Sequence, residues 1–220
     1  MIISEFVAVV IIAYLLGSIP FGLIIGKVSK GIDITKYGSG KIGGTNVMRA
    51  VGTKAGILTI VLDIGKAAGA VLLAAVIVGP GVLSVGGVII YYWQIAQVLA
   101  ALAVLAGHNW PIFSKFKGGR GVATFFGTLL PIFPPAAIFG GEVLAVTALN
   151  SRYMSLASIM AVMATWCLLI PMTIAYNLTP IYLAYSLVAI ALIIYQHRGN
   201  IRRLQQGTER RLGEKGEQIS

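Results

Sequence analysis

The stretch "ISEFVAVVIIAYLLGSIPFGLIIGK" (residues 3–27) carries charge only near its ends, at Glu5 and Lys27. Roughly 20 apolar residues in a helix are enough to cross the hydrocarbon core of a bilayer, so this stretch predicts a membrane-spanning segment. A cleavable signal peptide would carry basic residues before its apolar core. Here they follow it, and we therefore expect the segment to stay in the membrane. Further apolar runs cover residues 55–79, 82–106, 157–176 and 179–197.

The composition of the whole chain also indicates a membrane protein. Hydrophobic residues make up 57% of the 220 positions and charged residues only 11%, and the mean hydropathy is +0.88, which excludes an ordinary soluble domain. A membrane β-barrel is excluded because the apolar runs are long and unbroken. Another apolar stretch, residues 121–150, is interrupted by Pro131, Pro134 and Pro135, which predicts two short helices or one re-entrant hairpin. We thus predict an all-α polytopic membrane protein with about seven transmembrane helices, or with five crossings plus a re-entrant hairpin.

The basic residues predict the orientation of the chain. Apart from Lys66, they fall within 27–54, 115–120, at Arg152 and within 198–215, whereas the turns near 79–82, 133–137 and 176–180 contain none. By the positive-inside rule the basic segments are cytoplasmic, which places the N-terminus outside and the C-terminus in the cytoplasm after an odd number of crossings. This topology and contact with anionic lipid account for the net charge of +10, so no nucleic-acid partner is expected.

Residues 1–197 are expected to form a single integral-membrane domain with cytoplasmic loops at about 31–54, 107–121 and 150–156. The polar tail, residues 198–220, is the one segment that looks detachable. It is expected either to form a surface helix on anionic lipid or to remain frayed.

Two of the loops combine closely spaced glycines with Lys or Arg and then run into an apolar segment: "GSGKIGGTNVMR" (38–49) and "GHNWPIFSKFKGGRGVAT" (107–124). Glycine lets backbone N–H groups approach an anion, helix N-termini favour negative charge, and the basic side chains supply the counter-charge. The loops therefore predict binding of two phosphate groups, or of one large anion from both sides.

A nucleotide is a weaker interpretation of the first loop. Gly38, Gly40 and Gly43 are spaced as G-x-G-x-x-G, and Asp63 follows at a suitable distance. A dinucleotide fold also needs a strand before the loop, and "KGIDITKY" (30–37) gives no convincing one, while Asp63 lies inside an apolar run. The Walker pattern fails because Gly44 and Thr45 follow Gly43.

Five segments taken together carry a family resemblance: "GSGKIGGTNVMRAVG" (38–52), "DIGKA" (63–67), "AGHNWPIFSKFKGGRGVAT" (106–124), "NSRYMSLASI" (150–159) and "HRGNI" (197–201). This ordered set resembles the bacterial acyl-phosphate:glycerol-3-phosphate acyltransferases, the PlsY family. The resemblance implies a seven-helix enzyme of the bacterial inner membrane that faces the cytoplasm. Such an enzyme transfers a fatty acyl group from acyl phosphate to the sn-1 hydroxyl of glycerol 3-phosphate and yields lysophosphatidic acid and phosphate. The expected partners are these two substrates and membrane lipids; the chain is expected to be a monomer with no cofactor and no metal.

The resemblance also implies the site residues. The catalytic candidates are Ser39, Arg49, His197 and Asn200. The substrate-binding candidates are Thr45, Asn46, Lys117, Gly118, Gly119, Arg120, Gly121, Ser151, Arg152 and Ser155. Arg120 stands where the family usually has Lys, which keeps the charge. Three other positions depart from the family pattern: Lys41 replaces Asn, Gly44 replaces Ala and Gly199 replaces Glu.

Several of these residues also have a purely structural interpretation. Ser39 and Asn46 are common turn formers or helix caps, and Arg49 and Arg152 are also positioned as topology determinants. We favour a structural role for His108. Asp63 and Lys66 are three residues apart on one helix face, and we expect them to pair with each other.

Acyl phosphate is already activated, so no Ser-His-Asp set is needed, and none is evident in the sequence. We expect direct transfer without an acyl-enzyme, with a substrate phosphate oxygen or His197 accepting the proton. A phosphate or organophosphate transporter is the alternative function, since it too would need basic groups near helices. It would also require ionisable or broken-helix features near the bilayer midplane, which the sequence does not clearly show.

Overall fold

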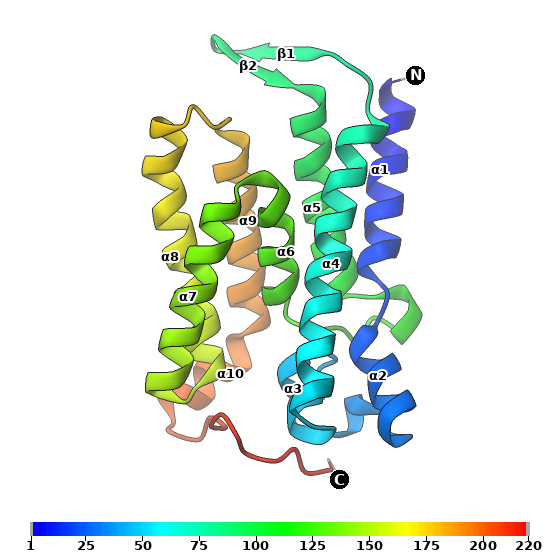
Figure 1. Ribbon diagram of the computed structural model, residues 1–220, viewed down its shortest axis with the longest axis vertical. Coiled ribbons are helices and arrows are strands. Elements are labelled where there is room, and N and C mark those ends of the chain that lie inside the picture. The colour runs from blue at the N-terminus through cyan, green and yellow to red at the C-terminus, as the bar shows by residue number, and fades with distance from the viewer. Residues whose placement is uncertain (1, 219–220) are drawn as a thin grey trace.

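The computed structural model describes residues 2–218 as a bundle of roughly parallel and antiparallel helices (Figure 1). The α-helices are α1 (Ile2–Gly17), α2 (Phe21–Lys30), α3 (Gly44–Ala50), α4 (Thr53–Ile77), α5 (Tyr92–Asn109), α6 (Val122–Ile132), α7 (Pro134–Ser151), α8 (Met154–Ala175), α9 (Ile181–Gln196) and α10 (Arg198–Gln205). Two 3-10 turns, η1 (Ile34–Lys36) and η2 (Ile112–Ser114), and two strands, β1 (Val82–Val85) and β2 (Val88–Tyr91), complete the fold.

The apolar runs form the long helices, as the sequence predicts. Within residues 2–218, four helical segments are long and apolar enough to cross a membrane, namely Ile2–Lys30, Thr53–Ile77, Tyr92–Ser114 and Met154–Ala175. A fifth is α9 taken with α10, which is bent by 58° at His197. The stretch 121–150 is divided at Phe133, and Pro134 occupies the first turn of α7, where its missing N–H costs nothing.

One prediction for the apolar runs is wrong. Residues 82–91 do not belong to a helix but form an antiparallel hairpin in which Val82 pairs with Tyr91 and Val85 with Val88. The turn residues Gly86 and Gly87 have φ of 56° and 81°, and two residues with positive φ between β-branched strands are the signature of a tight hairpin. Helix α5 therefore begins only at Tyr92.

Helices α1 and α5 approach each other at backbone distance. A Cβ atom added to Gly17 would lie 2.3 Å from the carbonyl oxygen of Val104, and one added to Gly107 would lie 2.3 Å from that of Tyr14. Small residues at facing positions allow such contacts in membrane bundles, where close packing supplies much of the association energy.

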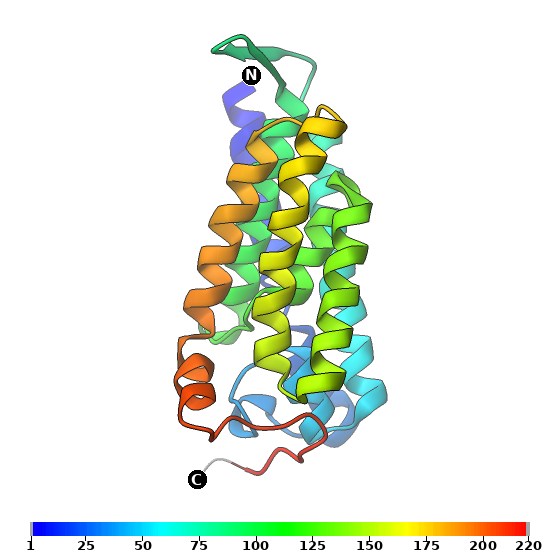
Figure 2. The same ribbon diagram turned by 90° about the vertical axis from the view of Figure 1, so that its left-hand side faces the viewer.

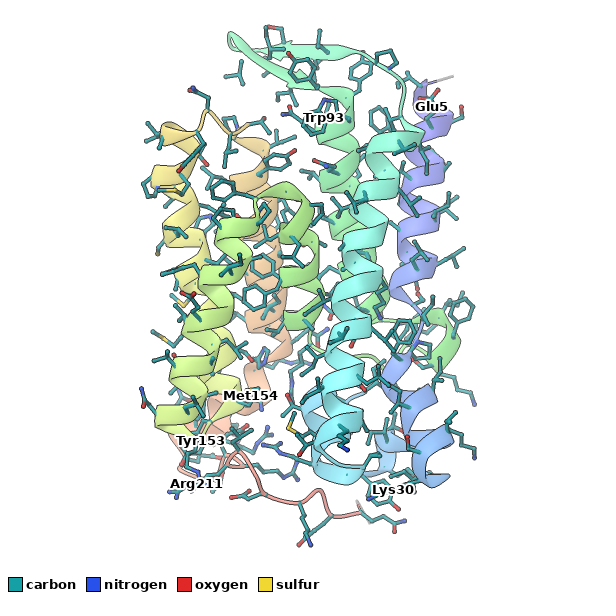
Figure 3. The ribbon with its side chains drawn as sticks, in the orientation of Figure 1. Glu5, Lys30, Trp93, Tyr153, Met154 and Arg211 are labelled. Carbon is teal, nitrogen blue, oxygen red and sulfur yellow. The ribbon has the colours of Figure 1, made fainter. Side chains whose placement is uncertain are left out.

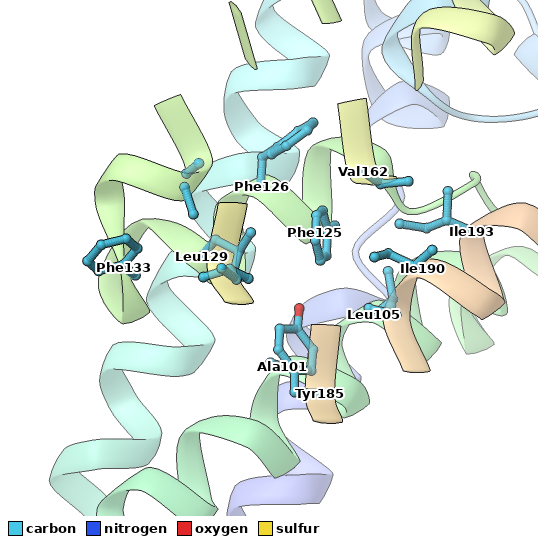
Figure 4. Packing of buried hydrophobic residues seen from close by; sticks show 14 of the residues in the cluster. Ala101, Leu105, Phe125, Phe126, Leu129, Phe133, Val162, Tyr185, Ile190 and Ile193 are labelled. Carbon is cyan, nitrogen blue, oxygen red and sulfur yellow. The ribbon is translucent and has the colours of Figure 1, made fainter. Parts of the chain in front are cut away.

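The principal core lies among α5, α6, α7, α8 and α9, with Val71 of α4 at its side (Figure 4). Phe125 and Leu129 of α6 pack there against Tyr185 and Ile193 of α9. The phenol of Tyr185 is hydrogen-bonded to the hydroxyl of Thr128, so the polar atom brought into this core is satisfied.

The two ends of the bundle differ in character (Figures 1 and 3). One end carries the N-terminus and the β-hairpin, with Glu5 and Trp93 nearby. The opposite end, called here the C-terminal end, carries α2, α3, α10 and residues 206–218, with Lys30 and Arg211. Only part of the expectation for the tail holds, because α10 is a helix but the residues after it are neither detached nor frayed. They run across the C-terminal end of the bundle (Figure 2).

Candidate functional site

A cavity of about 350 Å³ lies in the C-terminal half of the bundle and is lined by residues from α3, α4, α5, α6, α7, α8 and α10 and from the loops between them. This volume is within the range of small-molecule sites. It brings together nine of the predicted site residues: Ser39, Thr45, Asn46, Arg49, Arg120, Gly121, Ser155, His197 and Asn200.

The other predicted site residues, Lys117, Gly118, Gly119, Ser151 and Arg152, do not line this cavity. Lys117 and Arg152 are exposed at the surface. The hydroxyl of Ser151 donates to the carbonyl oxygen of Thr147 and accepts from the backbone nitrogen of Tyr153, as expected of a residue that ends a helix. For all five residues, contact with a substrate remains a prediction.

Asn46 organises the first glycine loop. Its side-chain nitrogen lies 3.1, 2.9 and 2.9 Å from the carbonyl oxygens of Ile34, Tyr37 and Lys41, and its side-chain oxygen accepts from the backbone nitrogen of Ser39 at 2.9 Å. The amide is therefore occupied by the backbone, which supports the structural interpretation of Asn46. Its effect is to hold Ser39 at the cavity wall.

The second glycine loop is fixed against the end of α5. The backbone nitrogen of Gly119 donates to the carbonyl oxygen of His108 at 3.0 Å. A Cβ atom at Gly119 would lie 2.0 Å from Nε2 of His108. Only glycine permits this close approach. The next two residues, Arg120 and Gly121, line the cavity.

The polar wall of the cavity is cationic. Burial is the main factor that lowers the pKa of Arg120, to about 10, and it also lowers the pKa of Arg49 and of Lys41. The Nε atoms of Arg49 and Arg120 are buried and have no hydrogen-bond partner within residues 2–218. A buried guanidinium nitrogen without an acceptor is unfavourable, and an anion would supply one, so this wall is suited to a phosphate.

His197 faces the same cavity as a neutral base. Its Nδ1 atom lies 2.8 Å from the carbonyl oxygen of Ile193, which assigns the proton to Nδ1 and leaves Nε2 as an acceptor. Burial, followed by the charge of Arg120, lowers the pKa of His197 to about 4, so the ring is uncharged at neutral pH.

The rest of the cavity is apolar. Its wall includes Phe126 and Leu130 of α6, Ile138 and Leu144 of α7, and Ile64 of α4. The N-terminal turns of α6 and α8 also reach the cavity, and helix N-termini favour anions. One chamber thus joins a site for negatively charged groups to a hydrocarbon surface.

Comparison with known proteins agrees with this geometry. The family model for glycerol-3-phosphate acyltransferase matches residues 7–207. The chain belongs to the glycerol-3-phosphate acyltransferase family. It is 48% identical to glycerol-3-phosphate acyltransferase 3 of Dehalococcoides mccartyi (strain ATCC BAA-2266), over 98% of this chain and 99% of that protein. It is 38% identical to the glycerol-3-phosphate acyltransferase of Desulforamulus reducens, over 95% and 96% of the two chains.

Two crystal structures of PlsY (YgiH), an integral membrane glycerol 3-phosphate acyltransferase, are similar to the present fold at 38% identity. The lysophosphatidic acid form has a TM-score of 0.79 and covers 94% of this chain and 95% of that one. The glycerol 3-phosphate form has a TM-score of 0.81, with coverage of 94% and 96%. The present chain is therefore an integral membrane acyltransferase that acylates glycerol 3-phosphate in phospholipid synthesis.

Sequence reasoning missed two parts of this cavity. The apolar wall was missed because the α6 and α7 residues that form it look the same as residues facing lipid. Glu209 was missed because it lies in the polar tail, yet it lines the cavity. Asp63 and Lys66 pair as expected, at 2.8 Å, and Asp63 lies 3.4 Å from Nδ1 of His108. All three are buried, and Asp63 and His108 also line the cavity, whereas Lys66 does not.

Proposed function

We propose that the acyl donor is acyl phosphate and that the chain transfers its acyl group to the sn-1 hydroxyl of glycerol 3-phosphate, releasing lysophosphatidic acid and inorganic phosphate. The observation that carries the proposal is the single cavity with a cationic wall and an apolar wall. Both substrates bear phosphate, and the donor also bears a hydrocarbon chain. In acyl phosphate the charge lies beside the reactive carbonyl and the hydrocarbon chain follows it, so one cavity with both walls can hold the whole donor head.

The phosphate groups are held by Arg49, Arg120 and Lys41. Arginine forms a planar fork that matches two phosphate oxygens, and the buried, unpartnered Nε atoms of Arg49 and Arg120 supply one prong each. Binding a dianion would relieve the cost of burying these charges. The glycerol 3-phosphate form of the similar PlsY structure supports binding of this acceptor by the present chain.

The acyl chain lies between α6, α7 and α4, against Phe126, Leu130 and Ile138. Burying hydrocarbon on such a wall contributes roughly 0.8 kcal/mol per methylene, so the chain adds affinity far from the reacting atoms. The carbonyl carbon is then located where the apolar wall meets Arg120 and His197.

The transfer is a direct substitution at the carbonyl carbon. The sn-1 oxygen of glycerol 3-phosphate forms a bond to the acyl carbon, the bond from that carbon to the phosphate oxygen breaks, and the hydroxyl proton ends on the departing phosphate. The Nε2 atom of His197 accepts the hydrogen bond of the attacking hydroxyl, takes its proton as the new bond forms and passes it to the departing phosphate. Positioning of the two substrates and stabilisation of negative charge by the arginines supply the acceleration.

The chain spans the bacterial inner membrane seven times, with α1, α4, α5, α6, α7, α8 and α9 as the crossings. The N-terminus lies outside, and the cavity and the C-terminus face the cytoplasm. The position of the two termini at opposite ends of the bundle supports an odd number of crossings (Figure 1). The collection of basic residues at the C-terminal end supports its cytoplasmic location. We propose that the enzyme acts as a monomer; a single chain contributes residues to both the cationic and the apolar wall of the cavity.

The donor and the position of acylation are tested with the purified protein in detergent. Glycerol 3-phosphate is offered with palmitoyl phosphate or with palmitoyl-CoA, and the product is assigned by NMR as the 1-acyl or 2-acyl ester. We expect the 1-acyl ester from palmitoyl phosphate only. Product from palmitoyl-CoA only, or a 2-acyl ester formed before any migration, would refute the proposal.

A further inference from the structure

The tail after α10 is tied to three segments around the rim of the cavity. These segments are the first glycine loop, the end of α3 and the α7–α8 connection, which lie far apart in the sequence (Figure 2). The backbone pairs, with their N···O distances, are Leu212 with Arg152 (2.6 Å), Gly216 with Arg49 (3.2 Å) and Gly38 with Glu217 (2.9 Å). The tail is thus a strap across the mouth of the cavity.

One side chain of this strap enters the cavity wall. Glu209 is only 9% exposed. Its Oε1 atom accepts from Oγ of Ser155 at 3.0 Å and from Nδ2 of Asn200 at 2.7 Å, and its Oε2 atom lies 2.7 Å from Nε of Arg203. A hydroxyl, an amide and a guanidinium that converge on two oxygens would hold a phosphate in the same way.

The charges that line the cavity favour a carboxylate at the position of Glu209. Two carboxylates line the cavity, those of Asp63 and Glu209. Asp63 is already paired with Lys66. Glu209 is therefore the remaining carboxylate among the described lining residues that offsets the charges of Arg49 and Arg120. A phosphate dianion would balance these cations more completely than a carboxylate and offers more acceptor atoms.

The strap also engages Arg49. One terminal nitrogen of its guanidinium donates to the carbonyl oxygens of Arg210 and Arg211, at 3.3 and 3.2 Å, while its Nε atom has no partner within residues 2–218. Neutral carbonyls are weak partners for a guanidinium compared with a phosphate. Arg49 and Asn200, which both line the cavity, are thus both hydrogen-bonded to the tail.

We propose that Glu209 is an internal competitor for the substrate phosphate: its carboxylate occupies an anion subsite formed by Ser155, Asn200 and Arg203, and an incoming phosphate displaces it together with the strap. This inference rests on the proposed function only in naming a phosphate-bearing substrate. A tethered competitor is present at a high effective concentration, so the subsite is free in only a fraction of the molecules. The apparent Kd of the substrate is then its intrinsic Kd divided by this fraction. Return of Glu209 then favours release of the free phosphate product.

The kinetic test compares Glu209→Gln with Glu217→Gln, which removes the same charge from an exposed position of the same strap. Because the neutral amide competes poorly, Glu209→Gln is expected to lower the KM for a phosphate-bearing substrate about three- to tenfold. The KM of Glu217→Gln is expected to stay within about twofold of the wild-type value. An unchanged or higher KM with a reduced kcat in Glu209→Gln would show that Glu209 supports the site, and would overturn the proposal.

The displacement itself is tested without catalysis. Hydrogen exchange at the amides of Leu212 and Gly216 is followed in the unmodified protein with inorganic phosphate, glycerol 3-phosphate or a non-reacting acyl phosphonate, against chloride at equal ionic strength. Faster exchange with any of the three phosphorus ligands supports displacement, and the ligand that acts at the lowest concentration shows which substrate uses the subsite. Unchanged or slower exchange with all three, under conditions where binding is measured by calorimetry, refutes it. This result is independent of whether acyl phosphate proves to be the donor.

Discussion

The side-chain oxygen of Asn46 accepts a hydrogen bond from the backbone nitrogen of Ser39 at 2.9 Å, while its nitrogen is shared among three carbonyl oxygens of the same loop. One amide at the start of α3 thus shapes the loop that carries Ser39 to the cavity. The two residues are seven apart in the sequence, and their contact follows from the conformation of the loop rather than from a helical or strand repeat.

Asn46→Ala is expected to destabilise the protein by about 2–3 kcal/mol, because it leaves buried backbone groups without a partner. Asn46→Asp keeps the acceptor for Ser39 but loses the donor to the three carbonyls, and should also be destabilising. Unfolding midpoints in detergent measure both effects, with exposed Lys36→Ala as the control. Unchanged midpoints would show that the loop does not depend on this amide.

Gly119→Ala should disrupt the second loop. The new methyl group would meet Nε2 of His108, so the loop must shift and carry Arg120 with it. We expect kcat/KM for glycerol 3-phosphate to fall at least about tenfold, since small displacements of binding groups have large kinetic effects.

The matched control for this substitution is Gly65→Ala, also a glycine, in α4, where an added Cβ meets no atom within 4 Å. In a helix this change is expected to be neutral or to stabilise by about 0.5–1 kcal/mol. Equal kinetics for the two alanine variants would contradict the packing argument.

The protein should lose stability in mild acid through His197. Its pKa is lowered from 6.5 to about 4 by burial and by the charge of Arg120. Between these pH values the unfolded chain binds a proton at His197 that the folded chain does not. The contribution of His197 to the free energy of unfolding is therefore complete above pH 6.5 and decreases as the pH falls toward 4.

The loss from His197 amounts to at most about 3 kcal/mol. His197→Gln removes this titration and should show a shallower decrease in unfolding midpoint across the same pH window. Parallel curves for the wild type and the variant would show that His197 does not titrate abnormally.

Gly141→Leu should shorten the preferred acyl chain. Gly141 lines the cavity on α7, and a Cβ atom there meets nothing within 4 Å, so a larger side chain enters the apolar part of the chamber. We expect kcat/KM to fall for palmitoyl phosphate and to be maintained for decanoyl phosphate. A uniform change across chain lengths would place the acyl chain elsewhere.

The sequence predicted those features that depend on local composition. Long apolar runs become helices because a helix satisfies the hydrogen bonds of backbone groups that are removed from water. The proline cluster divides 121–150 where predicted. The hairpin at 82–91 was missed because Val82, Ile89 and Ile90 are as apolar as a transmembrane helix, and the decisive signal was only the Gly86–Gly87 pair.

The site was predictable where glycine and arginine occur together in a loop. It was not predictable where residues distant in sequence meet, as at Glu209 and Ser155, since a polar tail shows no sign of where it will fold back. The placement of Lys117 outside the cavity has a similar cause: the tight packing of Gly118 and Gly119 turns Arg120 inward and leaves Lys117 at the surface.

We propose that the acyl group passes directly from acyl phosphate to glycerol 3-phosphate in a chamber where Arg49 and Arg120 bind phosphate. The most direct test measures phosphate release and lysophosphatidic acid formation in one rapid-mixing reaction with palmitoyl phosphate, with and without glycerol 3-phosphate. We predict equal amounts of the two products, no burst of phosphate without glycerol 3-phosphate, and loss of both products in Arg120→Gln. A burst equal to the enzyme concentration without glycerol 3-phosphate, or full activity of Arg120→Gln, would contradict the account.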